Sequence, residues 1–205
     1  VTLYVTRHGK TILNTNHRAQ GWADSPLVEK GVEVATNLGT GLKDIHFMNA
    51  YSSDSGRAIE TANLVLKYSE QSKLKLENMW DVVGKAAGVA SPEELMKFSI
   101  QEVINLIRVA DPTKQAEDWE LFSTRIKAEI DKISEEAAGN GGGNVLVVVH
   151  GLLITTLIEM LDSSKTKLGV ENASVTKIVY QDGTYTVESV GDMSYVAKGK
   201  ESVEI

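Results

Sequence analysis

Two arginines and two histidines have side chains that together could carry out phosphoryl transfer. They are Arg7, His8, Arg57 and His150. The fork-shaped guanidinium group binds phosphate oxygens in pairs, and an unprotonated imidazole is a competent nucleophile toward phosphorus. Neighbouring cations lower the pKa of an imidazole and favour that unprotonated form. The set therefore predicts transfer of a phosphoryl group from a phosphomonoester to His8 and then to water.

The residues around Arg57 and His150 add donors for the same anion. The serine-rich loop 52–56 and the helix start that follows it offer hydroxyl and N–H groups, a combination that suits phosphate. A second histidine can donate a hydrogen bond to the transferring group. No metal ion and no other cofactor is needed if arginine and histidine supply the positive charge. Each piece alone has an ordinary explanation, such as a helix cap or a hydrogen-bonded histidine, but their combination favours catalysis.

Each histidine follows a strand-like run and precedes a glycine. Residues 1–5 are β-branched or aromatic around one leucine, and residues 145–149 are valine and leucine only. A buried strand that ends abruptly in polar residues and a glycine is typical of the rim of an α/β sheet, where ligands bind. If the two strands are parallel neighbours, His8 and His150 face one pocket. The interpretation depends on that pairing.

Hydrophobic periodicity indicates the elements around these strands. Further strands are expected at 47–51, 73–77, 175–180 and 184–190, the last two joined by a hairpin at 181–183. Helices are expected at 29–42, from residue 54 or 55 to 66, and at 99–108, 119–138 and 152–161, with another start at 92–94. The tail from Gly191 is expected to be loosely held. This order predicts a three-layer α/β/α sandwich with a mostly parallel mixed sheet, in a single domain spanning residues 1–205.

Composition narrows the class of protein. The 205 residues are 42% hydrophobic and 24% charged, ordinary values for a globular protein. The net charge of −7 argues against nucleic acid or an acidic membrane surface as the main partner, although a local arginine cluster still permits a small anionic ligand. No apolar run approaches the roughly 20 residues of a transmembrane segment. The lack of cysteine excludes disulfides and thiolate catalysis. We expect a cytoplasmic protein or, alternatively, one exported or membrane-anchored through a segment before Val1.

Several segments together resemble the histidine phosphatase superfamily, in its phosphoglycerate-mutase-like branch. Residues 7–14 are similar to the Arg-His-Gly-x-Thr-x-x-Asn signature of that family, and residues 20–31 to its Gly-x-x-Asp-x-Pro-Leu-x-x-x-Gly loop. Residues 51–62 resemble its second arginine segment, residues 147–151 its second histidine segment, and residues 172–175 its late Asn-x-Ser segment. The matches are specific as a set and cover most of the chain.

The resemblance implies a fold of the phosphoglycerate mutase type and a phosphatase that works without a metal ion or cofactor. By resemblance, His8 is the phosphorylated nucleophile. The residues implied to hold the phosphoryl group or to line the substrate pocket are Arg7, Arg57, His150, Asn14 and Gly151. The implied partner is a small phosphorylated substrate or phosphate, whereas the identity of the substrate and the oligomeric state are not specified.

One part of the family pattern is missing. Members usually carry an acid, in a segment like Leu-Arg-Glu-x-x-x-Gly-x-x-Glu-Gly, that protonates the leaving alcohol. The segment is expected near Lys75 or Glu77; Gly84 and Gly88 have the right mutual spacing, but no acid precedes Gly84 at the family's distance. Either the segment is absent from the printed sequence or the protein has lost this donor, and the otherwise complete phosphate pocket favours the first. Glu77 and Asp81 are weak substitutes.

Two alternatives to a phosphatase stay open. A cofactor-dependent phosphoglycerate mutase would use the same phosphohistidine, but the family's dedicated mutases are longer and have extra segments that cover the pocket. A catalytically impaired phospho-ligand-binding protein would keep Arg7, Arg57 and His150 without the acid.

Overall fold

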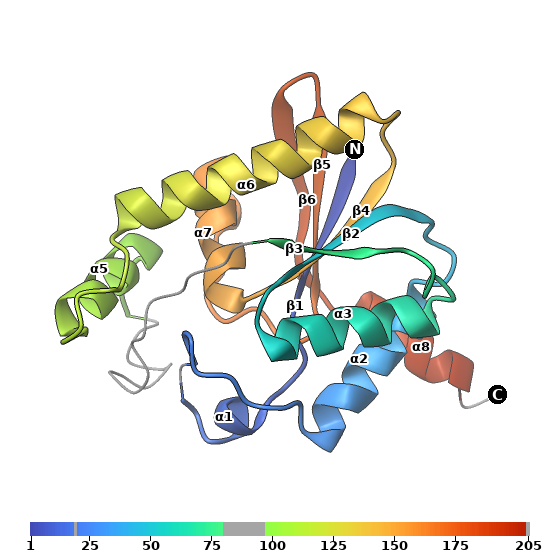
Figure 1. Ribbon diagram of the computed structural model, residues 1–205, viewed down its shortest axis with the longest axis horizontal. Helices are drawn as coiled ribbons and strands as arrows, with labels where there is room; N and C mark the ends of the chain where they lie inside the picture. The colour runs from blue at the N-terminus through green and yellow to red at the C-terminus, as the bar shows by residue number, and fades with distance from the viewer. Residues whose placement is uncertain (19, 80–96, 204–205) are drawn as a thin grey trace.

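The computed structural model describes residues 1–18, 20–79 and 97–203, and its centre is a six-stranded sheet (Figure 1). In spatial order the strands are β3 (Leu76–Met79), β2 (Phe47–Ser53), β4 (Asn144–Val149), β1 (Thr2–Arg7), β5 (Val175–Gln181) and β6 (Thr184–Asp192). The pairs from β3 to β1 are parallel, whereas β1–β5 and β5–β6 are antiparallel. The prediction of a mostly parallel mixed sheet is confirmed.

The predicted pairing of the two histidine-bearing strands is also confirmed. β1 and β4 are parallel neighbours, with Arg7 opposite Val149. Their side chains alternate between the two faces of the sheet. Leu3 and Val5 of β1 belong to the core on one face, and Tyr4 belongs to the core on the other. Both faces are covered, so the middle of each strand is hydrophobic.

Helices cover both faces of the sheet and make the three layers. The described helices are α1 (Ile12–Thr15), α2 (Glu29–Gly41), α3 (Gly56–Tyr68), α5 (Ile100–Ala110), α6 (Trp119–Gly139), α7 (Gly151–Leu161), the 3₁₀ turn η1 (Ser163–Lys165) and α8 (Ser194–Val203). α5, α6 and α7 pack against one face, and α2, α3 and α8 against the other (Figure 1). Among the residues that the structure describes, no helix combines the length and the apolar character needed to cross a membrane.

Local sequence signals explain where several elements begin and end. Ser99 and Glu102 form a capping box at the start of α5, and Asp118 caps α6 through the N–H of Leu121. The hairpin between β5 and β6 turns at Asp182 and Gly183, which both have positive φ angles of 50° and 77°. Consecutive positive φ angles are what a tight hairpin turn requires, and Asp-Gly adopts them readily.

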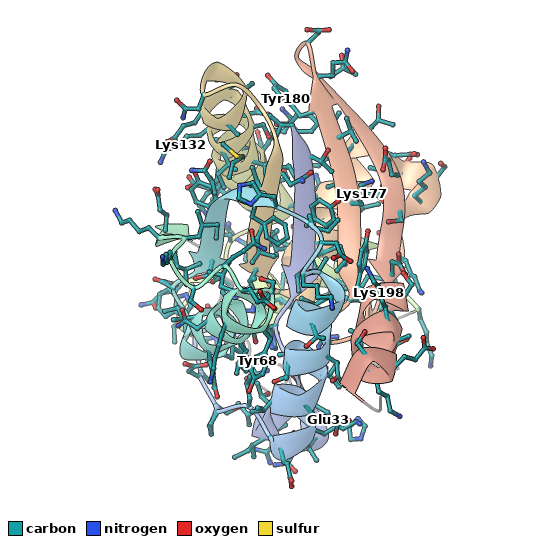
Figure 2. The ribbon with its side chains drawn as sticks, turned by 90° about the vertical axis from the view of Figure 1, so that its right-hand side faces the viewer. Glu33, Tyr68, Lys132, Lys177, Tyr180 and Lys198 are labelled. Atoms are coloured by element: carbon teal, nitrogen blue, oxygen red, sulfur yellow. The ribbon has the colours of Figure 1, made fainter. Side chains whose placement is uncertain are left out.

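The C-terminal segment differs from the prediction. The tail from Gly191 was expected to be loose, but β6 continues to Asp192 and residues 194–203 form α8, which lies beside α2 (Figure 2). Two glycines allow this contact. A Cβ atom on Gly41 would lie 1.8 Å from the carbonyl oxygen of Tyr195, and one on Gly199 would lie 1.8 Å from that of Asn37. The two backbones therefore approach more closely than any larger residue would permit.

Two further expectations concern the segment before α5. The strand expected at 73–77 begins only at Leu76, because residues 72–74 form a turn instead. The helix start expected at 92–94 lies outside the described residues, as do Asp81, Gly84 and Gly88.

Candidate active site

The four predicted residues meet at the carboxyl ends of three parallel strands. His8 follows β1, His150 follows β4, and Ser53 ends the neighbouring β2. Arg57 stands in the first turn of α3, immediately after β2. The imidazole rings of His8 and His150 lie with their centroids 5.2 Å apart, and His8, Arg57 and His150 are all at least 93% buried. The register of β1 and β4 is what places the two histidines together.

His8 is held in one tautomer by its own backbone neighbour. Its Nδ1 lies 2.8 Å from the carbonyl oxygen of Gly9. A carbonyl oxygen only accepts, so Nδ1 carries the proton and the neutral ring keeps its lone pair on Nε2. Burial, together with the charges of Arg7 and Arg57, lowers the pKa of His8 to about 3, against the opposing effect of the Gly9 hydrogen bond. The result is a neutral imidazole with one available lone pair.

A buried threonine fixes this end of β1 to α3. Thr61 Oγ1 accepts a hydrogen bond from the N–H of Gly9 at 2.9 Å and donates one to the carbonyl oxygen of Arg57 at 2.7 Å. Its side chain is completely buried. Thr61 therefore couples the position of His8 to that of the helix turn that carries Arg57.

His150 bridges the arginine and a serine. Its Nδ1 lies 3.3 Å from Arg57 Nη2, and its Nε2 lies 2.9 Å from Ser53 Oγ and 3.5 Å from Ser55 Oγ. A guanidinium group only donates, so Nδ1 accepts here and the proton of the neutral ring is on Nε2. Burial is the main cause of the lowered pKa of His150, with further lowering from His8, Arg57 and Arg7.

Arg7 lies beside the start of α7. Burial, with the nearby charge of Arg57, lowers its pKa to about 10, so the guanidinium group stays charged at neutral pH. Its Nη1 donates to the carbonyl oxygen of Val170, whereas its buried Nε has no hydrogen-bond partner in the part of the chain that the structure describes. A Cβ atom on Gly151 would lie 3.3 Å from that Nε. Gly151 thus leaves the room that the Arg7 side chain uses.

Arg57 is held by the loop that precedes α2. Its Nη1 donates to the carbonyl oxygen of Ala23 and to Asp24 Oδ1, both at 3.0 Å, and its Nη2 donates to the carbonyl oxygen of Gly21 at 3.1 Å. The same Nη2 faces His150. The guanidinium plane is therefore fixed between the loop on one side and the second histidine on the other.

Asn14 is oriented by a second asparagine. Its Oδ1 accepts from the N–H of Thr11 and from Asn172 Nδ2, both at 3.3 Å. Asn172 Nδ2 also donates to the carbonyl oxygen of His8 at 2.8 Å. Because the oxygen of the Asn14 amide is used in this way, its N–H groups remain as the donors for a ligand.

One expected anion site is taken by a carboxylate. The N–H groups of Gly56 and Arg57, at the start of α3, donate to Asp24 Oδ2 at 2.7 Å and Oδ1 at 3.4 Å. The expectation that these two groups bind the anion is therefore wrong, although the hydroxyls of Ser53 and Ser55 do lie at the site. The other helix start at the site, that of α7 after His150, has no side-chain cap. The positive end of the α7 dipole thus lies beside the two histidines.

Three residues that support the site had no role assigned from the sequence: Thr61, Asp24 and Asn172. All three fall within the segments that resemble the family, so the motifs marked their positions. What each one contacts depends on the tertiary structure, and the motifs alone did not indicate it.

The comparisons with known proteins agree with this geometry. A family model described as "Histidine phosphatase superfamily (branch 1)" matches residues 3–193. A crystal structure of phosphoglycerate mutase from Bacillus anthracis str. Sterne is 86% identical, with a TM-score of 0.89 over 98% of this chain and 96% of that one. "Probable phosphoglycerate mutase GpmB" of Escherichia coli is 27% identical over 95% of this chain and 94% of its own. A phosphoserine phosphatase from Entamoeba histolytica, 18% identical with a TM-score of 0.71 over 95% of this chain and 98% of that one, shares the fold.

Proposed function

Because the chain belongs to the histidine phosphatase superfamily, we propose that it hydrolyses phosphomonoesters through a phosphohistidine at His8. One observation carries the proposal. His8 is neutral and buried, its Nδ1 proton is held by Gly9, and its ring faces His150 with Arg7 and Arg57 close enough to lower its pKa. This arrangement presents the Nε2 lone pair to a tetrahedral anion surrounded by positive charge.

The first step forms a P–N bond and breaks the P–O ester bond. His8 Nε2 attacks the phosphorus, and the leaving group departs as an oxyanion with the electron pair of the ester bond and then takes up a proton from the solvent or from a donor acid. Arg7 and Arg57 balance the charge of the transferring group through their N–H donors. The imidazolium that forms keeps its Nδ1 hydrogen bond to the Gly9 carbonyl.

The second step transfers the phosphoryl group to water. A water molecule attacks the phosphorus of phosphohistidine, the P–N bond breaks, the electron pair returns to Nε2, and the proton lost by the attacking water passes to the solvent. The start of α7 and the amide of Asn14 supply donors that remain in place through both steps.

Glu77 and Asp81 are the two acids that the sequence places near the missing family segment. Glu77 lies within β3, where it pairs with Tyr51 of β2, and Asp81 lies outside the described residues. Esters whose leaving group is stable as an anion need no such donor. p-Nitrophenyl phosphate is such an ester, so its hydrolysis tests the nucleophile separately from the acid.

The test is the steady-state hydrolysis of p-nitrophenyl phosphate by the wild-type protein and by two histidine variants. His8→Ala removes the proposed nucleophile and is expected to abolish turnover. His46→Ala removes an exposed histidine that precedes β2, at the opposite end of that strand from Ser53, and is expected to leave turnover unchanged. Equal turnover by the wild-type and His8→Ala proteins would refute the proposed function.

A mutase is the second candidate, since the structure with 86% identity is one of a phosphoglycerate mutase. Both activities share the phosphohistidine and differ in whether water or a second phosphoglycerate accepts the phosphoryl group. The rate of interconversion of 3- and 2-phosphoglycerate, with and without 2,3-bisphosphoglycerate, separates them. Interconversion that is much faster than release of inorganic phosphate would favour the mutase. Tight binding of phosphate without turnover would favour a phospho-ligand-binding protein.

A further inference from the structure

We propose that Asp24 is a positioning residue for phosphate binding: it occupies the start of α3 and anchors Arg57, so that the phosphoryl group is received between the two histidines and the start of α7. This inference rests on the proposed function, because it concerns the same anion. Asp24 touches no reacting atom and acts through Arg57.

The contacts of Asp24 reach across two segments of the chain. Its Oδ2 accepts the N–H of Gly56 at 2.7 Å, and its Oδ1 lies 3.4 Å from the N–H and 3.0 Å from Nη1 of Arg57. One carboxylate thus binds both the backbone and the side chain of the residue that is to bind phosphate. The first N–H groups of a helix have no partner within the helix, and a carboxylate is a favourable partner for them.

Because Asp24 caps α3, the hydroxyl of the neighbouring Ser55 is not needed as the cap. Ser55 occupies the N-cap position of α3 with an extended backbone (φ −71°, ψ 141°), yet its hydroxyl makes no capping hydrogen bond. A serine at that position normally caps its own helix. Here the Ser55 hydroxyl lies 3.5 Å from His150 Nε2 instead. Because Asp24 caps α3 from another segment, the Ser55 hydroxyl is available to the site.

The contacts of Arg57 separate an outer side from an inner side. Nη1 is engaged by Asp24 and by the Ala23 carbonyl, whereas Nη2 donates to the Gly21 carbonyl and also faces His150. The Asp24 side chain is 43% exposed and that of Arg57 is 3% exposed, so the carboxylate meets the guanidinium group from the solvent side. Its negative charge is therefore screened by water, while the buried side of Arg57 remains positive toward the anion.

Two substitutions at position 24 divide these roles. Asp24→Ala removes the cap and the anchor of Arg57 together. Asp24→Asn keeps one carbonyl oxygen that can accept from Gly56 N–H, but it loses the charge opposite Arg57. The matched control is Glu117→Ala, which breaks another carboxylate–arginine pair. In that pair, Glu117 Oε2 lies 2.6 Å from Nη2 of Arg125 on α6.

The experiment measures the competitive inhibition constant of inorganic phosphate, together with kcat and KM for p-nitrophenyl phosphate. We expect Asp24→Ala to raise the inhibition constant and KM by roughly tenfold or more, since a displacement of about 1 Å in a positioned group can cost about 100-fold. Asp24→Asn should show a smaller rise, and kcat should fall less than kcat/KM in both variants. Glu117→Ala should leave all three constants unchanged.

Two results would overturn the proposal. One is an inhibition constant of phosphate in a folded Asp24→Ala protein that lies within about twofold of the wild-type value or below it. A constant below the wild-type value would mean that the carboxylate only repels the anion. The other is an equal loss of phosphate affinity in Glu117→Ala. If Asp24→Ala does not fold, Asp24→Asn with wild-type constants has the same meaning. Failure of the wild-type protein itself to bind phosphate would refute the proposed function, a distinct outcome.

Discussion

Replacement of Thr61 by valine tests how the nucleophile is coupled to α3. Valine has nearly the shape of threonine but neither donates nor accepts. The N–H of Gly9 would then be buried without the acceptor that now lies 2.9 Å away, and the 2.7 Å hydrogen bond to the Arg57 carbonyl would be lost. Because Thr61 is fully buried, water is not at hand to replace it.

The expected magnitude follows from these two bonds. Leaving a buried N–H unsatisfied costs about 1–3 kcal/mol, so we expect Thr61→Val to lower the free energy of unfolding by about 2 kcal/mol. For a chain of 205 residues this corresponds to a decrease in Tm of about 4–8 °C. Thr61→Ser keeps the hydroxyl and loses one methyl group, at a cost of about 1 kcal/mol.

The assay combines thermal denaturation with the hydrolysis of p-nitrophenyl phosphate. A loosened Gly9 also loosens the carbonyl that holds His8 Nδ1. We therefore expect kcat/KM to fall several-fold in Thr61→Val but to stay near the wild-type value in Thr61→Ser. If the valine variant is at least as stable as the serine variant and equally active, the coupling through Thr61 is refuted.

Three further predictions follow from single groups. The pKa of His8 is about 3 in the folded protein and 6.5 in an ordinary histidine, so the unfolded chain binds more protons between these two values. The free energy of unfolding should therefore decrease as the pH falls through this window, and it should decrease less in His8→Gln. Denaturant titrations of both proteins at about pH 7 and about pH 4.5 measure this difference. An equal slope in both proteins would contradict this. Gly199→Ala places a Cβ atom 1.8 Å from the Asn37 carbonyl and should lower stability by about 2 kcal/mol without changing kcat/KM; an unchanged Tm would contradict the close contact. Gly151→Ala places a Cβ atom 3.3 Å from Arg7 Nε and should raise the inhibition constant of phosphate severalfold with little change in Tm, whereas an unaltered constant would show that Arg7 does not need this space.

The central strands could be predicted because their sequences have one physical explanation. Apolar residues that are buried on both faces, such as Leu3 to Val5 and Val145 to Val149, belong in the middle of a parallel sheet, and both β1 and β4 are followed by His-Gly. The amphipathic helix α6 and the Asp-Gly hairpin were equally clear, because periodicity and turn chemistry are local properties.

The elements that were missed depend on contacts between distant segments. α8 is polar and contains Gly199, so its sequence alone gives little indication of a helix. Its position depends on the matching glycine at position 41 of α2, which only the folded chain reveals. The late start of β3 at Leu76 has the same origin, since the pairing with Ala50 of β2 decides where that strand begins.

The site shows the same division. The chemistry of Arg7, His8, Arg57 and His150 could be inferred from residue types and from their places after strands. The tautomers could not be inferred, because they depend on the Gly9 carbonyl and on Arg57. The sequence also did not show that the start of α7, rather than that of α3, is left for the anion. This depends on the carboxylate of Asp24, which is 32 residues away from Gly56 in the chain and accepts its N–H.

The most direct test of the account is to locate the phosphoryl group on the enzyme. The protein is mixed with p-nitrophenyl phosphate, quenched rapidly in alkali, digested and examined by mass spectrometry. The account predicts phosphate on the peptide that contains His8, stable in alkali and lost in acid, and none on the corresponding peptide of His8→Ala. Phosphate on a serine, such as Ser53 or Ser55, or hydrolysis without any labelled histidine, would contradict it.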